Sequence, residues 1–319
     1  MSNNRKDHSG GVKFFTSVGG QALLEGIMMR GPARQAIVCS TPEGYVTKVE
    51  EIHPLKDRYP VLGWPVIRGA VAFITSMITG VKAMMFSASC LPEEEQEEPG
   101  RFEQWISRHF NDRQTEKMLI GTSVFLGTVL AVGLFFLLPT VLTGLLGDLG
   151  GSRLLKNLIE GLIRIAIFIG YLALTTRIKE ISRVWQYHGA EHKTIYCYEK
   201  ELELTVENCR EQSRLHPRCG TSFLFLTMII SILVFALVSW KNVWIRLVLR
   251  LALLPVVFGL SYELIKFAGR HDNLLTRIIS APGKGLQRLT TKEPDDDMIR
   301  VAIEALKMVI PEKKEEALW

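Results

Sequence analysis

The run from Tyr187 to Lys193 carries the side chains best suited to chemistry in this sequence. His188 and His192 are four positions apart, so on a helix their imidazoles lie on one face and can bind the same metal ion. Glu191 projects beside them. Inverted zincins use this H-x-x-E-H spacing, with a carboxylate positioned to take a proton from the attacking water. The spacing therefore predicts a site for zinc or another divalent metal, with Glu191 as the catalytic base.

Four further residues are candidates for completing such a site. His216 and Cys219 lie within one short motif, and imidazole and thiolate both suit zinc, so either could be the third or fourth ligand. Glu263 follows His192 at roughly the spacing of the third ligand in inverted zincins, and Glu25 could reach the same face. A hydrogen-bonded helix face without metal is the alternative interpretation of the histidines. An ion pair with an arginine is the alternative for Glu263.

Long apolar segments are the elements that must position these residues. The 319-residue chain is 47% hydrophobic with a mean hydropathy of +0.16. A soluble protein can also reach these values, so the distribution of apolar residues along the chain must distinguish a membrane protein from a soluble one. A helix needs about 20 apolar residues to cross a bilayer. The segments that meet or approach this length are residues 119–146, 154–176, 222–240 and 244–265. The sequence thus predicts a mostly α, polytopic membrane helix bundle of about four spans over 119–265, with a loop at 177–221 that carries the H-x-x-E-H pattern.

Two features inside the predicted bundle have structural consequences. Pro139 is expected to kink the first span because its missing N–H removes one helical hydrogen bond. Glu160 and Arg164 are i, i+4 neighbours in the second span, and an intramembrane charge is costly unless it is paired. They are expected to form an ion pair that faces the bundle, with a substrate contact as the alternative.

The remaining segments are predicted to be soluble or to lie at the membrane surface. Residues 1–60 form an α+β segment with a β-hairpin at 35–40 and 45–52, preceded at 18–32 by a loop or short helix. Residues 61–90 are apolar only over 69–81, which is short for a span and predicts an interfacial or re-entrant helix. Residues 91–118 are an acidic linker and an amphipathic lead-in. Residues 266–319 are a helical segment whose amphipathic helix begins near Asp295.

The distribution of Lys and Arg predicts the orientation. The 177–221 loop holds eight of these residues, whereas the turns near 147–156 and 241–246 hold two each, so the long loop and both termini are expected in the cytosol of a multi-pass plasma-membrane protein. A net charge of only +5, gathered in particular loops, favours the lipid bilayer and other membrane proteins as partners and disfavours nucleic acid.

Four motifs resemble the YqhQ-like family of bacterial multi-pass membrane proteins: GGQALLEGIMMRGP, YHGAEHKTIYCYE, HPRCGTSF and LQRLTTKEPDDDMI. The similarity extends from about Gly19 to Ile310. The resemblance implies a domain of unknown function that is labelled a metal-dependent enzyme, and with it His188, Glu191, His192, His216 and Cys219 as site residues. It implies no particular reaction. True inverted zincins are soluble peptidases with a glutamate as third ligand, from which this sequence departs.

Three functions are compatible with these patterns. The first is a metal-dependent hydrolase at the cytosolic membrane interface, with His188, His192 and either Cys219 or His216 as ligands. The second is a non-catalytic scaffold for the assembly or quality control of membrane proteins, in which any metal is structural. The third is a transporter or channel with charged residues along a path, which the small number of spans and the lack of a visible inverted repeat disfavour.

Overall fold

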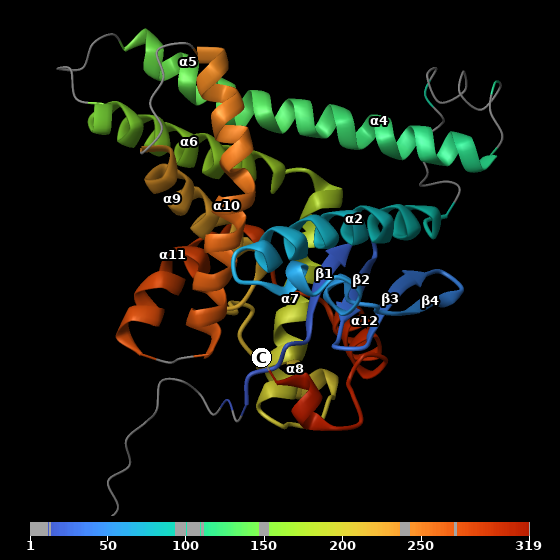
Figure 1. Cartoon of the computed structure of the whole chain (residues 1–319). Coiled ribbons are helices and arrows are strands. Elements are labelled where there is room, and N and C mark those ends of the chain that lie inside the picture. Colours follow the sequence, from blue (N-terminus) through green and yellow to red (C-terminus); the bar gives the residue numbers. More distant parts are fainter. Residues whose placement is uncertain are drawn as a thin grey trace, which may run out of the picture. The chain divides into compact units, whose positions relative to one another are not determined.

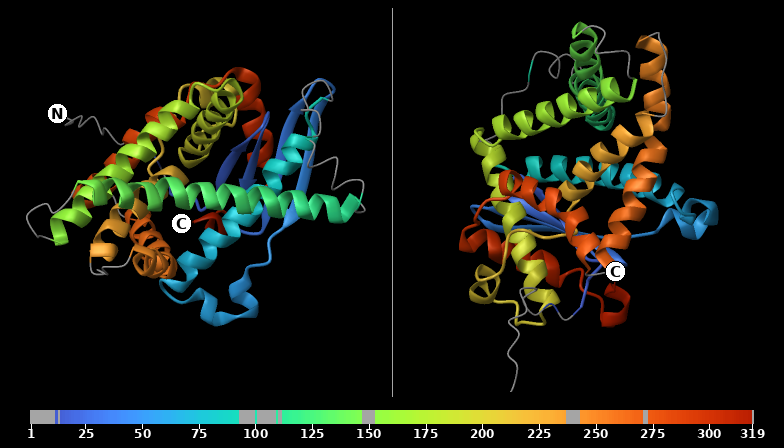
Figure 2. Two further views of the ribbon diagram at one scale, coloured as in Figure 1. Left: turned by 90° about the horizontal axis from the view of Figure 1, so that it is seen from above. Right: turned by 90° about the vertical axis from the view of Figure 1, so that its left-hand side faces the viewer.

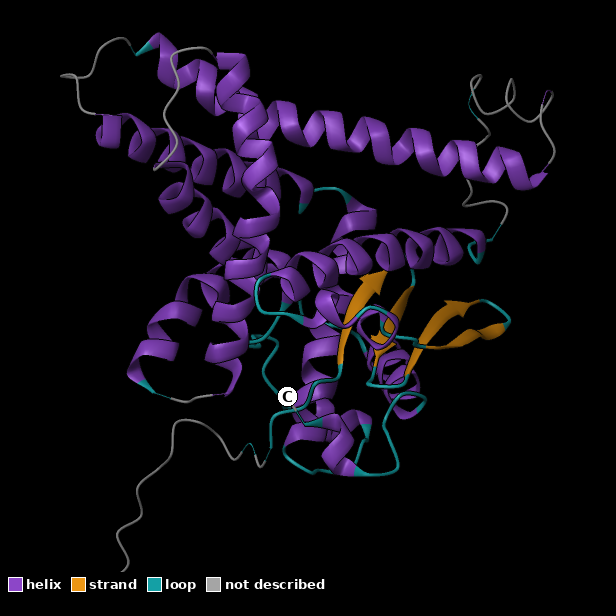
Figure 3. Ribbon diagram, in the orientation of Figure 1, coloured by secondary structure: helices purple, strands orange, loops and turns teal. Residues whose placement is uncertain are grey.

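The computed structural model describes residues 14–92, 112–146, 153–236, 243–270 and 273–318, together with residues 12, 100 and 109. The chain divides into two compact units, and most of the described residues are helical (Figures 1 and 3). Unit 1 comprises residues 1–91, 172–230 and 255–319, and unit 2 comprises residues 92–171 and 231–254.

A four-stranded antiparallel sheet forms the centre of unit 1. Its strands, in spatial order, are β1 (Gly19–Leu23), β2 (Gly26–Arg30), β3 (Arg34–Thr41) and β4 (Gly44–Glu51). The hairpin predicted at 35–40 and 45–52 is confirmed as β3 and β4. The prediction of a loop or short helix at 18–32 is wrong, because this segment forms a second hairpin, β1 and β2, which turns at Glu25 with a φ of 46°.

Helices cover both faces of this sheet, which explains the missed hairpin. On one face, α7 (Lys179–Glu199) and α12 (Asp296–Lys307) pack on residues such as Ile27 and Met29. On the other face, α2 (Ile67–Ser89) packs on Met28 and its neighbours (Figure 2). Because β2 is buried on both sides, its residues are continuously apolar and give no period-2 alternation.

Four described helices are long and apolar enough to cross a membrane, as the predicted fold class requires. They lie at Ile67–Ser89, Gly121–Leu145, Leu155–Thr175 and Trp244–Ala268. This set differs from the predicted one in two places. Helix α2 is 23 residues long and extends well beyond the apolar run at 69–81. Helix α9 (Gly220–Ala236) is shorter, and the predicted span at 222–240 continues into residues outside the described ones.

Unit 2 contains α4 (Asp112–Val132), α5 (Leu138–Leu145), most of α6 (Arg153–Thr175) and the beginning of α10 (Val243–Arg270). Between α4 and α5 a π-helical turn, Gly133–Leu137, precedes Pro139, so the proline does interrupt the regular helix. The predicted ion pair is present, with Arg164 Nη2 3.2 Å from Glu160 Oε1. Arg250 also binds Glu160, through two hydrogen bonds. Most of the predicted acidic linker and lead-in, at 93–99, 101–108 and 110–111, lies outside the described residues.

The C-terminal amphipathic helix is confirmed as α12. The Asp295 carboxylate accepts a hydrogen bond from the Met298 backbone N–H at 2.9 Å, which caps the helix where the sequence predicts its start. Its apolar stripe, including Val301, Ala302 and Ala305, is buried in the core that α12 shares with the sheet. The remaining elements of unit 1 are α11 (Leu274–Thr290) and the short segments α1 (Leu55–Arg58), η1 (Pro60–Gly63), α8 (Val206–Arg210) and η4 (Lys314–Ala317).

Candidate metal centre

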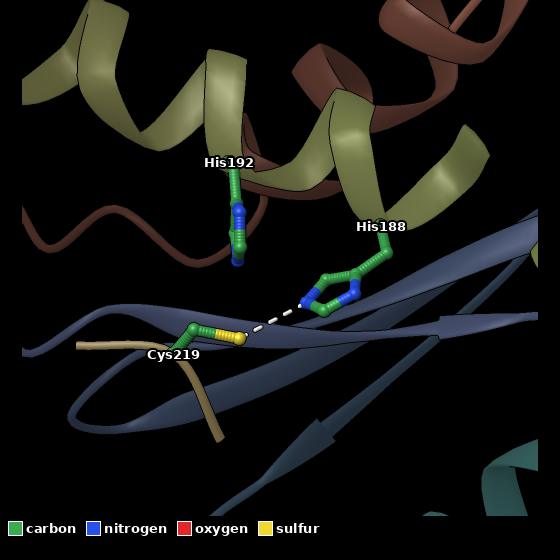
Figure 4. Close-up of side chains that lie close together, drawn as sticks. All are labelled: His188, His192 and Cys219. Carbon is green, nitrogen blue, oxygen red and sulfur yellow. Dashed lines mark hydrogen bonds between the residues drawn. The ribbon is translucent and has the colours of Figure 1, made fainter. Parts of the chain in front are cut away.

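Helix α7 brings the two histidines of the H-x-x-E-H pattern together, as predicted. His188 and His192 lie one turn apart with their ring centroids 4.4 Å from each other. Both project from the same side of α7 toward Cys219, which directly precedes α9 (Figure 4). The Nε2 atom of His188 is 3.1 Å from Cys219 Sγ.

The three side chains form a convergent and buried cluster. Within the described part of the chain, His188, His192 and Cys219 are the group of three or more possible ligands whose ligand atoms all lie within 4.8 Å of one another. Their exposed fractions are 8%, 1% and 8%. The sequence left Cys219 and His216 as equal candidates for the third ligand, and the structure brings Cys219 to the histidines.

Backbone carbonyls fix the tautomers of both histidines. His188 Nδ1 is 2.7 Å from the Thr290 carbonyl oxygen, and His192 Nδ1 is 2.5 Å from the Arg214 carbonyl oxygen. A carbonyl only accepts, so each Nδ1 carries the proton and each Nε2 is left as the ligand atom. His192 Nε2 is buried without a hydrogen-bond partner among the described residues. Metal-binding histidines typically donate their other N–H in this way, so the residues fit a metal ion.

The electrostatics of the cluster favour a thiolate. Burial alone would raise the pKa of Cys219, but His188 and His192 outweigh burial and hold the pKa well below its usual value. Burial likewise opposes the charged form of His188, and the neighbouring Cys219 outweighs it, which raises the pKa of His188 to about 9. Without a metal ion, His188 can therefore be an imidazolium that donates from Nε2 to a Cys219 thiolate, and a bound metal ion would take the place of this Nε2 proton.

Glu191 lies beside this cluster, and its carboxyl group interacts electrostatically with all three side chains. Burial raises the pKa of its carboxyl group, and the neighbouring His188 and His192 oppose this effect. The carboxyl group also lies beside the edge strand β1, next to Gly20. A Cβ added at Gly20 would lie 3.0 Å from the Glu191 carboxyl carbon and 2.7 Å from the Met28 carbonyl oxygen. The position of Glu191 thus depends on glycine at residue 20.

His216 faces away from the ligand cluster. Its Nε2 is 3.2 Å from the Glu199 carboxylate, which also binds Arg218. Burial lowers the pKa of His216 to about 4, so it is neutral and can donate its Nε2 proton to Glu199. His216 nevertheless lies near the site, because its ring centroid is 5.7 Å from that of His192. Sequence inspection missed Glu199, which is one charged residue among many at the end of α7.

The two further glutamates take part in ion pairs outside the cluster. Glu25 binds Arg183 through two hydrogen bonds and accepts a third from the Tyr187 hydroxyl at 3.3 Å. It thereby holds the β1–β2 turn against the first half of α7. Glu263 binds Arg68 through two hydrogen bonds, of which that from Arg68 Nε measures 2.7 Å, so the arginine alternative for Glu263 is correct.

Two comparisons with known proteins match most of the chain. Residues 64–312 match the family model described as "Protein of unknown function (DUF1385)". The chain is also 34% identical over 299 residues to the protein described as "Uncharacterized protein YqhQ" from Bacillus subtilis (strain 168), covering 90% of each chain. No solved structure matches the chain.

Proposed function

This chain belongs to the DUF1385 family, and we propose that it is a membrane-embedded, metal-binding hydrolase that acts at the cytosolic membrane surface. One observation carries the proposal: three ligand side chains converge, and a buried glutamate that is not one of them lies directly beside them. Structural zinc sites typically have four protein ligands, whereas catalytic sites have three and keep one position open. The three-ligand arrangement therefore supports a catalytic site.

The residues of the site have separate roles in this proposal. His188, His192 and Cys219 would hold the ion, and the Thr290 and Arg214 carbonyls would orient the two imidazoles. A bound divalent ion would supply Lewis acidity for hydrolysis. Glu191 would accept a proton from the attacking water and pass it to the leaving group, which suits its raised pKa.

Packing within unit 1 supports a definite membrane orientation. The sheet, α7 and α12 share one buried core, so they must lie on the same side of the membrane. The chain must then cross an even number of times between β4 and α7, although three apolar helices lie there. We propose that α2 is the helix that does not cross, because Ala83, Met84 and Phe86 pack on the sheet.

The same reasoning applies between α7 and α12. The span at Trp244–Ala268 needs a second crossing to return the chain, and α9 is the apolar helix available for it. Its 17 residues extend about 25 Å, and the sequence continues with the apolar Leu237 and Val238. Four crossings with α2 at the interface therefore remain the proposed topology. The eight Lys and Arg residues of 177–221 favour the cytosol for the shared core.

Metal content and function, measured in parallel, test the proposal. The purified wild-type chain should contain about one zinc-like ion, and the His188→Ala, His192→Ala double variant should contain none. His53→Ala is the matched control because His53 is exposed, and it should retain the metal. Glu191→Gln preserves the shape of the side chain and removes its basic oxygen, so it should retain the metal and lose function in complementation of a deletion strain. Loss of a general base typically costs 10²- to 10⁴-fold in rate.

Two results would contradict the proposal. Equal metal content in wild type and the double histidine variant would locate the ion elsewhere. Full complementation by a metal-loaded Glu191→Gln protein would remove the catalytic role and leave the scaffold function.

The scaffold function is the second candidate, and strand β4 is the observation that favours it. This edge strand is exposed along its whole length, with Tyr45, Val46 and Val49 exposed by 45%, 39% and 50%. An exposed edge strand can pair with an extended segment of another protein. Under this alternative, charged substitutions at Val46 and Val49 would impair complementation while Glu191→Gln would not.

A further inference from the structure

A pocket of about 250 Å³ lies between α2 and the β1–β2 edge of the sheet. Its lining includes Arg30 from β2, Gly20 and Gln21 from β1, and Ser76 and Thr79 from α2. The pocket and the candidate metal centre lie on opposite faces of the sheet. Gly20 is next to both, because it lines the pocket and contacts Glu191. Because residues 19 and 20 are both glycine, only bare backbone separates the pocket from Glu191 here.

The guanidinium of Arg30 is the charged group of this pocket. Burial lowers its pKa, and no carboxylate opposes that effect. Among the described residues, Arg30 has no ion pair or side-chain hydrogen bond, whereas Arg68 and Arg183 in the same unit each bind a glutamate. A partly buried cation without a counter-charge is available to bind an anion, which would offset the cost of its burial.

The hydroxyl groups of α2 add donors to this charge. Serine and threonine in helices commonly bond back to a carbonyl of the preceding turn, as Ser87 and Ser89 do in this helix. Ser76 and Thr79 make no such bond within the described part of the chain. Their hydroxyls therefore remain available to a ligand in the pocket.

We propose that this pocket binds a phosphate group, with Arg30 as the anchor and Ser76, Thr79 and Gln21 as neutral donors. Arginine presents several N–H groups in a planar fork that matches the oxygens of a phosphate. The phosphate could belong to a lipid headgroup or to a soluble phosphate compound. The link to Glu191 rests on the proposed function, in which the bond to be hydrolysed would lie across the Gly19–Gly20 backbone from the anchored phosphate.

The neighbours of the pocket on α2 favour the lipid source. Ile74, Met77 and Ile78 are exposed by 55%, 52% and 55%. Exposed apolar residues beside phosphate donors are the combination expected of a helix at the boundary between headgroups and acyl chains. An amphiphile with an anionic headgroup would contact both the polar donors of the pocket and the exposed apolar residues of α2.

Binding to the metal-stripped full chain in neutral detergent tests this proposal independently of catalysis. Inorganic phosphate is titrated in one arm. Micelles containing phosphatidylglycerol are titrated in the second, with phosphatidylcholine for comparison. Arg30→Gln should weaken binding at least tenfold, and the double variant Ser76→Ala, Thr79→Val about threefold. Arg34→Gln is the matched control, because Arg34 is an exposed arginine of the same sheet outside the pocket, and it should bind as wild type.

The arms separate the outcomes. Arg30-dependent binding in both arms supports a general phosphate site, and Arg30-dependent binding of phosphatidylglycerol alone supports a lipid site. Binding that Arg30→Gln leaves unchanged overturns the proposal, as does a loss that Arg34→Gln shares. If Arg30→Gln does not fold, unchanged binding by the folded Ser76→Ala, Thr79→Val protein overturns it. Because no metal is present, failure here is distinct from failure of the hydrolase proposal.

Discussion

Removing the Glu160 carboxylate should destabilise unit 2 more than any surface charge change. Glu160 accepts hydrogen bonds from the Thr140 hydroxyl at 2.8 Å and from Arg164 and Arg250. The exposed side-chain fractions of the glutamate and the two arginines are 3%, 5% and 2%. Glu160→Gln therefore leaves two buried guanidinium groups without their counter-charge. Breaking a buried pair from one side typically costs about 3–5 kcal/mol.

Thermal unfolding of the purified chain in detergent measures this effect. At about 2–4 °C per kcal/mol, the Glu160→Gln midpoint should fall by on the order of 10 °C. Glu304→Gln is the matched control, since Glu304 pairs with Lys307 on α12 at 3.0 Å with both side chains more than 40% exposed. Exposed pairs contribute about 0–1 kcal/mol, so its midpoint should change by at most a few degrees. Equal shifts for the two variants would refute the inference that burial makes the Glu160 ion pairs contribute more to stability than an exposed ion pair does.

Two further predictions concern pH and topology. The pKa of His216 is about 4 in the folded chain and about 6.5 when unfolded. Between these two pH values the unfolded state binds more protons, so the unfolding free energy should fall as the pH falls from about 6.5 to about 4. From pH 7 to pH 5 this loss is about 2 kcal/mol. Urea unfolding at the two pH values should show the loss for wild type and not for His216→Gln. An unchanged pH dependence in that variant would mean that a residue other than His216 causes it. For topology, a cysteine at Gly100 should resist a membrane-impermeant maleimide in intact cells, whereas one at Leu146 should react. Labelling at Gly100 would mean that α2 crosses the membrane.

The common face of the two histidines could be predicted from the sequence, whereas the third member of the cluster could not. The i, i+4 spacing of His188 and His192 fixes their common face on any helix, and the structure confirms it. Cys219 and His216 are three residues apart in a segment without periodicity, so spacing gave no preference between them. The distinction comes from Glu199, which binds His216 and keeps it turned from the cluster. Such a contact depends on tertiary packing that no local pattern records.

The fold was predictable where one face of an element is polar and unpredictable where both faces are buried. Helix α12 has an acidic start and an apolar stripe, and both features appear where the sequence predicts them. Strand β2 lacks alternation because α2 and α12 cover its two faces. Helix α2 lies within the helix predicted at 61–90, but the apolar run at 69–81 understates the length over which this helix is apolar enough to cross a membrane. The helical residues after Val81 also pack on the sheet.

The candidate site depends on segments far apart in the sequence, which makes it a property of the whole of unit 1. Gly20 positions Glu191 from the N-terminal sheet, Arg214 and Thr290 orient the histidines through their carbonyl oxygens, and Cys219 supplies the thiolate. The segment after Thr290 is fixed in turn, because the Lys292 backbone N–H donates to the Trp185 carbonyl of α7 at 2.8 Å. A Cβ at Gly189 would lie 2.1 Å from the Lys292 carbonyl oxygen, so this close approach requires glycine within the H-x-x-E-H pattern itself. The glycine between the histidines is therefore as necessary to the candidate site as the three clustered side chains, since it lets the C-terminal segment come close enough to orient His188.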